Sequence, residues 1–166
     1  MKAYIALSCK VGAYHRVLDK LLELNLSKKN IFLLLGSIDI LVQFSELKGL
    51  DEFIEKWFNP IRMITADEPL IEKTLSLIVI AEGQSFTEEP YAFIFLNTQP
   101  RNLEKVQQKL LTLPQILSAD TVFGPYDVIC AARAKDALDL KRFVSQIQRD
   151  IPEIQGSMTA IVASLY

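Results

Sequence analysis

The sequence predicts an α+β protein of the dimeric α+β barrel type, with two ferredoxin-like βαββαβ units packed sheet to sheet as an intrachain pseudo-dimer. The main observation is an internal repeat, in which GSIDILVQF from Gly36 matches GPYDVICAA from Gly124. Each segment has a glycine, an aspartate three positions later and then an apolar strand. Apolar strands and helical stripes around these segments recur in the same order at almost the same offset. We interpret the repeat as a diverged duplication.

The second half shows the elements of one unit most clearly. Aromatic and β-branched runs predict strands, and apolar residues at spacings of three and four predict helices. Pro100 suits the first turn of a helix, and Pro114 ends that helix because the residue before a proline avoids helical geometry. The expected strands are residues 91–98, 116–123, 127–133 and 157–165, and the expected helices are residues 100–113 and 137–149.

The first half repeats this order less regularly. The expected strands are residues 2–8, 30–35, 38–44 and 74–80, and the expected helices are residues 13–25 and 47–58. An extra stretch, Asn59 to Lys73, contains two prolines and is expected to be irregular or partly helical. The polar, acidic segment AEGQSFTEEP separates the halves. The expected domains are a diverged first repeat at residues 1–81, a linker at 82–90 and a second repeat at 91–166.

The strands are apolar on nearly every residue, as in AFIFL, VICAA and LSLIVI. A sheet with one solvated face would alternate apolar and polar residues. Both faces of each sheet are therefore expected to be buried, one under the two helices of the unit and the other against the second sheet.

Composition and charge exclude several classes of protein. Lys and Arg total 18 against 20 Asp and Glu, so the chain lacks a basic face and no direct nucleic-acid contact is expected. The apolar runs are too short to cross a bilayer, and the amino terminus does not resemble a signal peptide. Cys9 and Cys130 lie in strands without C-x-x-C spacing, which favours small core residues in a reducing, cytoplasmic compartment.

Patterns typical of catalysis or metal binding are weak. His15 is the only histidine, and no ligand-type residues are spaced around it. The sequence has no glycine-rich phosphate loop, nucleophile elbow or metal signature. It therefore predicts no catalytic residue, no metal site, no cofactor and no enzymatic activity.

Several segments of the second half occur together in one known family. They are the Val122–Asp127 turn, the strand from Val128, the Ile151–Ile154 step and the strand from Ser157. Together they resemble the effector-binding (RAM) domain of the Lrp/AsnC family of transcription regulators. Glu153 departs from the family, which has glycine at that position. The first half resembles the domain more weakly, and the resemblance implies a tandem duplication without the family's helix-turn-helix domain.

The resemblance implies a sensing function. In the family, small ligands, commonly amino acids, bind in crevices between subunits near the Gly-x-x-Asp hairpins. By position, the expected ligand-binding residues are Gly124, Tyr126, Asp127, Ser157 and Thr159. A hairpin offers N–H groups to a carboxylate, and an aspartate can bind an ammonium group. Two alternatives stay open: Gly124 supplies only a positive φ, and Asp127 only holds the turn, as we expect for Asp39.

Three functions are consistent with these observations. The leading hypothesis is a non-enzymatic sensor of a small-molecule effector, such as an amino acid, that forms a homo-oligomer or assembles with related regulators. The alternative is a structural or protein-interaction module that assembles with such regulators without binding a ligand. The third is an enzyme of the wider dimeric α+β barrel type, and the scarcity of histidine argues against it.

Overall fold

The computed structural model describes residues 1–163, and these form two compact units. The first unit contains residues 1–78 and 163, and the second contains residues 79–162. The first half of the chain has β1 (Ala3–Cys9), α1 (Tyr14–Glu23), β2 (Ile31–Leu35), β3 (Ile40–Phe44), α2 (Leu50–Glu52), α3 (Asn59–Arg62) and β4 (Ile71–Ala81). The second half has β5 (Ala92–Thr98), α4 (Leu103–Leu111), β6 (Ile116–Phe123), β7 (Val128–Ala132), α5 (Ala137–Asp150) and β8 (Ile154–Ala163). The predicted order of elements is therefore found twice.

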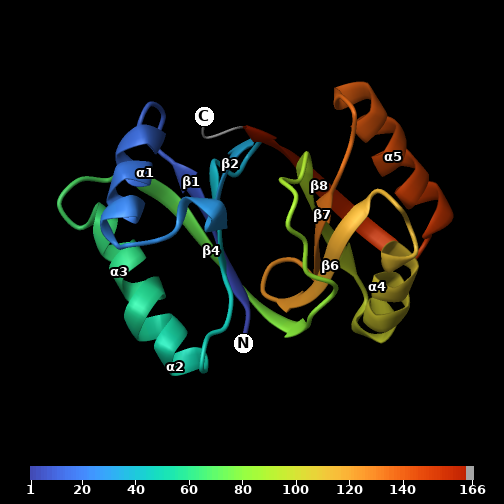
Figure 1. Ribbon diagram of the computed structural model, residues 1–166, viewed down its shortest axis with the longest axis horizontal. Helices are drawn as coiled ribbons and strands as arrows, with labels where there is room; N and C mark the ends of the chain where they lie inside the picture. Colours follow the sequence, from blue (N-terminus) through green and yellow to red (C-terminus); the bar gives the residue numbers. More distant parts are fainter. Residues whose placement is uncertain (164–166) are drawn as a thin grey trace. The chain divides into compact units, whose positions relative to one another are not determined.

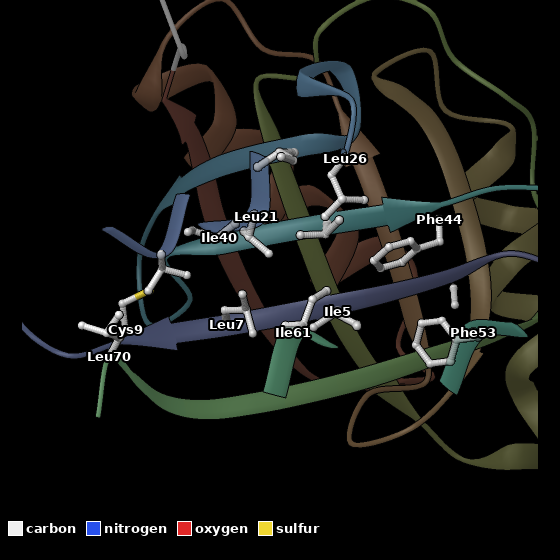
Figure 2. Packing of buried hydrophobic residues seen from close by; sticks show 14 of the residues in the cluster. Ile5, Leu7, Cys9, Leu21, Leu26, Ile40, Phe44, Phe53, Ile61 and Leu70 are labelled. Atoms are coloured by element: carbon white, nitrogen blue, oxygen red, sulfur yellow. The ribbon is translucent and has the colours of Figure 1, made fainter. Parts of the chain in front are cut away.

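The sheet of the first unit is antiparallel, with strand order β2-β3-β1-β4. Its helices lie on one side of the sheet (Figure 1). Alternate residues of β1 point toward them, and Figure 2 shows Ile5 and Leu7 close to Ile61 of α3. Phe44 of β3 packs against Phe53, with ring centroids 5.7 Å apart. Burying this continuous apolar cluster is what holds the helices on the sheet.

The second unit repeats this arrangement with strand order β6-β7-β5-β8. Helices α4 and α5 cover one face of its sheet (Figure 1). Ile94 and Leu96 of β5 point into the core between sheet and helices, where they meet Val106 of α4 and Phe143 of α5. Each apolar stripe therefore lies where its helical spacing predicts.

The helix expected at residues 47–58 begins later and continues further than the sequence predicts. Helix α2 passes into a π-helical turn at Phe53–Phe58, then into α3 and a 3-10 turn at Met63–Thr65. Pro60 has no N–H to donate, and its ring would clash with the carbonyl four residues earlier in a regular α-helix. The wider π turn accommodates this residue. The stretch from Asn59 is therefore helical at its start, and β4 begins at Ile71 instead of residue 74.

The last strand also begins earlier than predicted, at Ile154 instead of residue 157. Ile154 pairs with Thr98 at the end of β5, and the Thr98 hydroxyl donates to the carbonyl of Glu153 at 2.7 Å. These contacts extend the strand toward α5. The predicted end of the strand, residues 164–165, lies outside the described residues.

The acidic segment after β4 packs against β6 and α4 within the second unit. The N–H of Gly83 donates to the carboxylate of Asp120 in β6 at 2.7 Å, and Asp120 is fully buried. A Cβ added to Gly83 would lie 2.4 Å from the carbonyl oxygen of Ala119, so the two backbones are in close contact. Gln107 of α4 donates to the carbonyls of both Ala119 and Ala81. The segment from Ala81 to Gly83 is thus tied to β6 and α4.

Within residues 1–163, no helix has the length and apolar character needed to cross a membrane.

Candidate functional site

The hairpin between β6 and β7 carries three of the five predicted site residues. Its backbone is held by two hydrogen bonds of Asp127, whose N–H donates to Leu96 and whose carbonyl accepts from Val122, each at 2.9 Å. Gly124 at the tip has a φ of 154°, a value that residues with a Cβ rarely adopt. The hairpin therefore requires glycine at this position.

The carboxylate of Asp127 binds the end of the neighbouring strand β5. Its Oδ2 accepts a hydrogen bond from the N–H of Thr98 at 3.0 Å and a longer one from the Asn97 amide at 3.4 Å. The same Asn97 amide donates to the carbonyl of Pro125 at 3.2 Å. These bonds connect the hairpin to β5 and give Asp127 a structural role, as one of the two alternatives expected.

Asp39 of the first unit makes the same set of contacts. Its N–H donates to Leu7 at 2.9 Å, its carbonyl accepts from Leu34 at 2.8 Å, and its Oδ2 accepts from the N–H of Cys9 at 2.6 Å. Ser8 occupies the position equivalent to Asn97, and its hydroxyl donates a hydrogen bond to the carbonyl of Ser37 at 2.8 Å. The two aspartates therefore hold equivalent turns in the two units.

Tyr126 lies on the sheet face that is opposite to the helices. Its ring centroid is 5.2 Å from that of Phe95, and its hydroxyl donates to the sulfur of Met158 in β8 at 3.5 Å. Phe95 is fully buried and Tyr126 is partly buried. The three side chains form an aromatic and thioether cluster beside the hairpin, and we call it the Tyr126 cluster.

Ser157 and Thr159 lie on the other face of the same sheet. Their positions in β8 pair with Leu96 and Ile94 of β5, which point into the core beneath the helices. The exposed Ser157 hydroxyl accepts a hydrogen bond from Gln148 of α5 at 2.7 Å. The structure therefore brings Gly124, Tyr126 and Asp127 together and separates Ser157 and Thr159 from them by the thickness of the sheet.

Sequence reasoning missed three residues around the hairpin, namely Asn97, Phe95 and Met158. Asn97 could have been found from the repeat, because it occupies the position of Ser8 before the strand end that each aspartate binds. Phe95 and Met158 pair across β5 and β8, and their register could not be derived from either strand alone.

Glu153 is an ion-paired carboxylate near the hairpin. Glu153, beside the end of β5, lies 2.6 Å from the Lys105 ammonium and 3.2 Å from that of Lys109. Hydrogen bonding to Lys105 is the main reason that the pKa of Glu153 is lowered to about 2. Burial and the nearby Asp120 carboxylate raise the pKa of the Cys130 thiol, so this cysteine is a neutral core residue. Among residues 1–163, no group of three or more acidic, His or Cys side chains could hold a metal ion.

Comparison with known proteins identifies the second half. The model of the Lrp/AsnC ligand binding domain family matches residues 91–166. An uncharacterized HTH-type transcriptional regulator of Pyrococcus abyssi is 27% identical over 77 residues, which are 46% of this chain and 49% of that protein. The chain thus spans about half the length of the curated relative it matches.

Two solved structures are similar to this chain. The crystal structure of hypothetical protein PHS023 from Pyrococcus horikoshii is 35% identical, covering 45% of this chain and 89% of that chain with a TM-score of 0.41. The siroheme decarboxylase NirDL, in complex with an iron-uroporphyrin III analogue, covers 99% of this chain and 71% of its own, with a TM-score of 0.70 and 10% identity. At that identity the second similarity concerns the fold alone. Residues 91–166 of this chain therefore belong to the Lrp/AsnC ligand binding domain family.

Proposed function

We propose that this chain is a non-enzymatic regulatory protein whose second half binds a small-molecule effector, with amino acids as the ligand class. The observation that supports this most directly is the match of residues 91–166 to a ligand binding domain family. Gly124, Tyr126 and Asp127 are proposed as the contacts, because they share the hairpin. Ser157 and Thr159 lie on the helix face of the sheet, so they are not proposed to contact the same ligand molecule.

Chemistry at the hairpin supports an amino acid as ligand. Tyr126 presents a phenol ring at a partly buried position, where an apolar side chain of a ligand can pack. The carboxylate of Asp127 binds Thr98 and Asn97 through Oδ2. Its Oδ1 is proposed to accept a hydrogen bond from a ligand ammonium group.

The test is a calorimetric titration of the full chain with each common amino acid. We expect one chemical class to bind with a saturable heat, and we expect Tyr126→Ala, which removes the ring, to raise its dissociation constant. The matched control is Tyr14→Ala, which removes a ring from α1 of the first unit. No heat with any amino acid, or equal binding by the Tyr126→Ala and wild-type proteins, would contradict the proposal.

The alternative function is a protein-interaction module that assembles with helix-turn-helix-bearing relatives. It is favoured by the structural role of the Asp127 carboxylate and by Phe123, which is 74% exposed beside the hairpin tip. Native mass spectrometry of the protein as purified distinguishes the two functions, because it reports both a retained ligand and the assembly. An assembly that contains no ligand and does not change when amino acids are added favours this alternative.

We propose no catalytic activity for this chain, although one protein of similar fold is a siroheme decarboxylase. The single histidine, His15, is exposed on α1 and stacks on the ring of Tyr14 at 3.9 Å. Purified protein with bound haem would contradict this proposal. The sheet-to-sheet packing of the two halves likewise stays a prediction, and cross-linking mass spectrometry of the full chain tests it.

A further inference from the structure

A cleft of about 380 Å³ lies within the first unit, between the end of the α2–α3 helical segment and the beginning of β4. This volume falls in the range of small-molecule sites in proteins. One helical face contributes Phe58, Arg62 and Thr65, which are spaced by four and three residues and so point the same way. The other wall is formed by residues 71–74.

The extra stretch of the first unit builds both walls of this cleft. In the pairing of β1 with β4, Ser8 lies opposite Lys73 and Cys9 lies opposite Ile71, so Glu72 is the additional residue of a β-bulge. The second unit has the equivalent bulge at Gln155, so the bulge belongs to the fold, and the longer segment before it is what the first unit adds. In the second unit, residues 151–153 alone connect α5 to β8, and no comparable segment is available to form such walls.

The side chains of the cleft combine positive charge with apolar surface. The Arg62 guanidinium carbon lies 5.4 Å from the ring centroid of Phe58, so the ring orients it along the wall. Neither Arg62 nor Lys73 forms an ion pair with another described residue, and both are exposed. Phe58 and Ile71 are partly buried and supply the apolar surface. Glu72 adds one negative charge to the lining. Lys73 pairs with Ser8, so it points to the sheet face opposite the helices, and Arg62 is the cation on the helix wall of the cleft.

The hydroxyl groups of the cleft differ in their availability. Thr65 donates to the carbonyl of Glu68 at 3.0 Å and accepts from the N–H of Leu70 at 3.1 Å, so it stabilises the turn between the two walls. Thr74 is partly buried in the opposite wall and lies next to Lys73. Thr65 therefore fixes the shape of the cleft, and Thr74 is the hydroxyl that a ligand can reach.

We propose that this cleft binds a small organic carboxylate with a compact apolar body. The carboxylate contacts the Arg62 guanidinium, whose planar fork matches two carboxylate oxygens, and the Thr74 hydroxyl. The apolar body packs against Phe58 and Ile71. This site is separate from the hairpin of the second half and does not depend on the function proposed for it.

The experiment is an amide NMR titration of the full chain with benzoate, and with benzamide as the neutral ligand of the same shape. We expect benzoate to shift the amide signals of residues 62–65 and 71–74 in a saturable way, and benzamide to bind at least tenfold more weakly. Inorganic phosphate, which has charge but no apolar body, is also expected to bind more weakly than benzoate. Equal binding by benzamide or phosphate, or no saturable shift at these residues, overturns the proposal.

Charge-removing variants locate the site. Arg62→Gln is expected to raise the dissociation constant of benzoate about tenfold, as the loss of one charge-assisted hydrogen bond predicts. The matched control is Arg142→Gln, which removes the same charge from an exposed position on α5. Unchanged affinity in Arg62→Gln, or an equal loss in its control, contradicts the assignment. Tyr126→Ala leaves this affinity unchanged if the two sites are independent.

Discussion

The two units hold their β-hairpins with the same hydrogen bonds, and they differ in what surrounds each hairpin. Asp39 and Asp127 each bind the N–H of the last residues of a neighbouring strand, and each exchanges backbone bonds with equivalent partners. The residue before the aspartate is a buried isoleucine in the first unit and the partly buried Tyr126 in the second. The hydrogen bonds are therefore a property of the fold, and the neighbouring side chains distinguish the units.

The two units also differ in the segment that leads into their last strand. The first unit has a long connection from α3 to β4 and a cleft between them. The second unit has a short connection fixed by Glu153, and a buried Asp120 that binds the segment after β4. Repeated contacts thus maintain two copies of one architecture, and unrepeated contacts indicate where each copy acquired a separate property.

We expect the largest loss of stability at Gly83. This residue makes a close backbone contact in the second unit. Gly83→Ala places a Cβ 2.4 Å from the carbonyl oxygen of Ala119, and backbone atoms have little freedom to move away. We expect a loss of about 2–4 kcal/mol in the free energy of unfolding, measured by urea denaturation. The control Gly156→Ala has its nearest contact at 3.8 Å and should change stability little. Equal stability of the two variants would contradict the close contact.

The equivalence of the hairpins is tested by removing each aspartate. Asp39→Ala and Asp127→Ala each leave a backbone N–H without its acceptor, so each should lower the free energy of unfolding by about 1–3 kcal/mol. We expect similar losses because the bonds are the same, measured by urea denaturation against Asp19→Ala on the exposed face of α1. A loss in one variant and none in the other would show that the turns are not equivalent.

The short connection of the second unit predicts a dependence of stability on pH. Glu153 has a pKa lowered to about 2 in the folded protein, and the ordinary value is 4.5. A lowered pKa stabilises the folded state above the ordinary value, and this stabilisation is lost as pH falls toward about 2. Wild-type protein should therefore exceed Glu153→Gln in unfolding free energy at pH 6, with the difference disappearing by pH ~2. A difference that is constant across this range would exclude the ion pair as its cause.

The smallest effect concerns the single cysteine in each unit. Burial, with contributions from Asp39 and Glu72, raises the pKa of the Cys9 thiol to about 11. Cys130 is fully buried, and Cys9 is 9% exposed. Thiolate is the reactive form, so both thiols should react slowly with a disulfide reagent at pH ~8, and Cys9 faster than Cys130. Cys9→Ser and Cys130→Ser proteins give the two rates separately, and a faster rate at Cys130 would contradict the difference in burial.

Much of the fold could be predicted from periodicity. The Ala137 helix and the Ile116 strand begin where the apolar spacing indicates, because these elements depend on neighbours in the sequence. The helix before Pro60 was predicted to end too early, since a π turn absorbs the proline and spacing alone does not indicate such a turn. The family of residues 91–166, inferred from the hairpin and the last strand, is confirmed. The ligand contacts inferred with it stay a prediction.

The sequence by itself determined the repeated order of the elements and the hairpin aspartates, because each depends on residues within a few positions of one another. Tertiary structure decided which of the predicted site residues share a face, since one strand's register against the next places Met158 beside Tyr126 and turns Ser157 away. It also decided that Asp120 is buried against Gly83, and that Arg62 lies across a cleft from Thr74. These contacts join segments far apart in the chain, so they arise only when packing brings their strands and helices together.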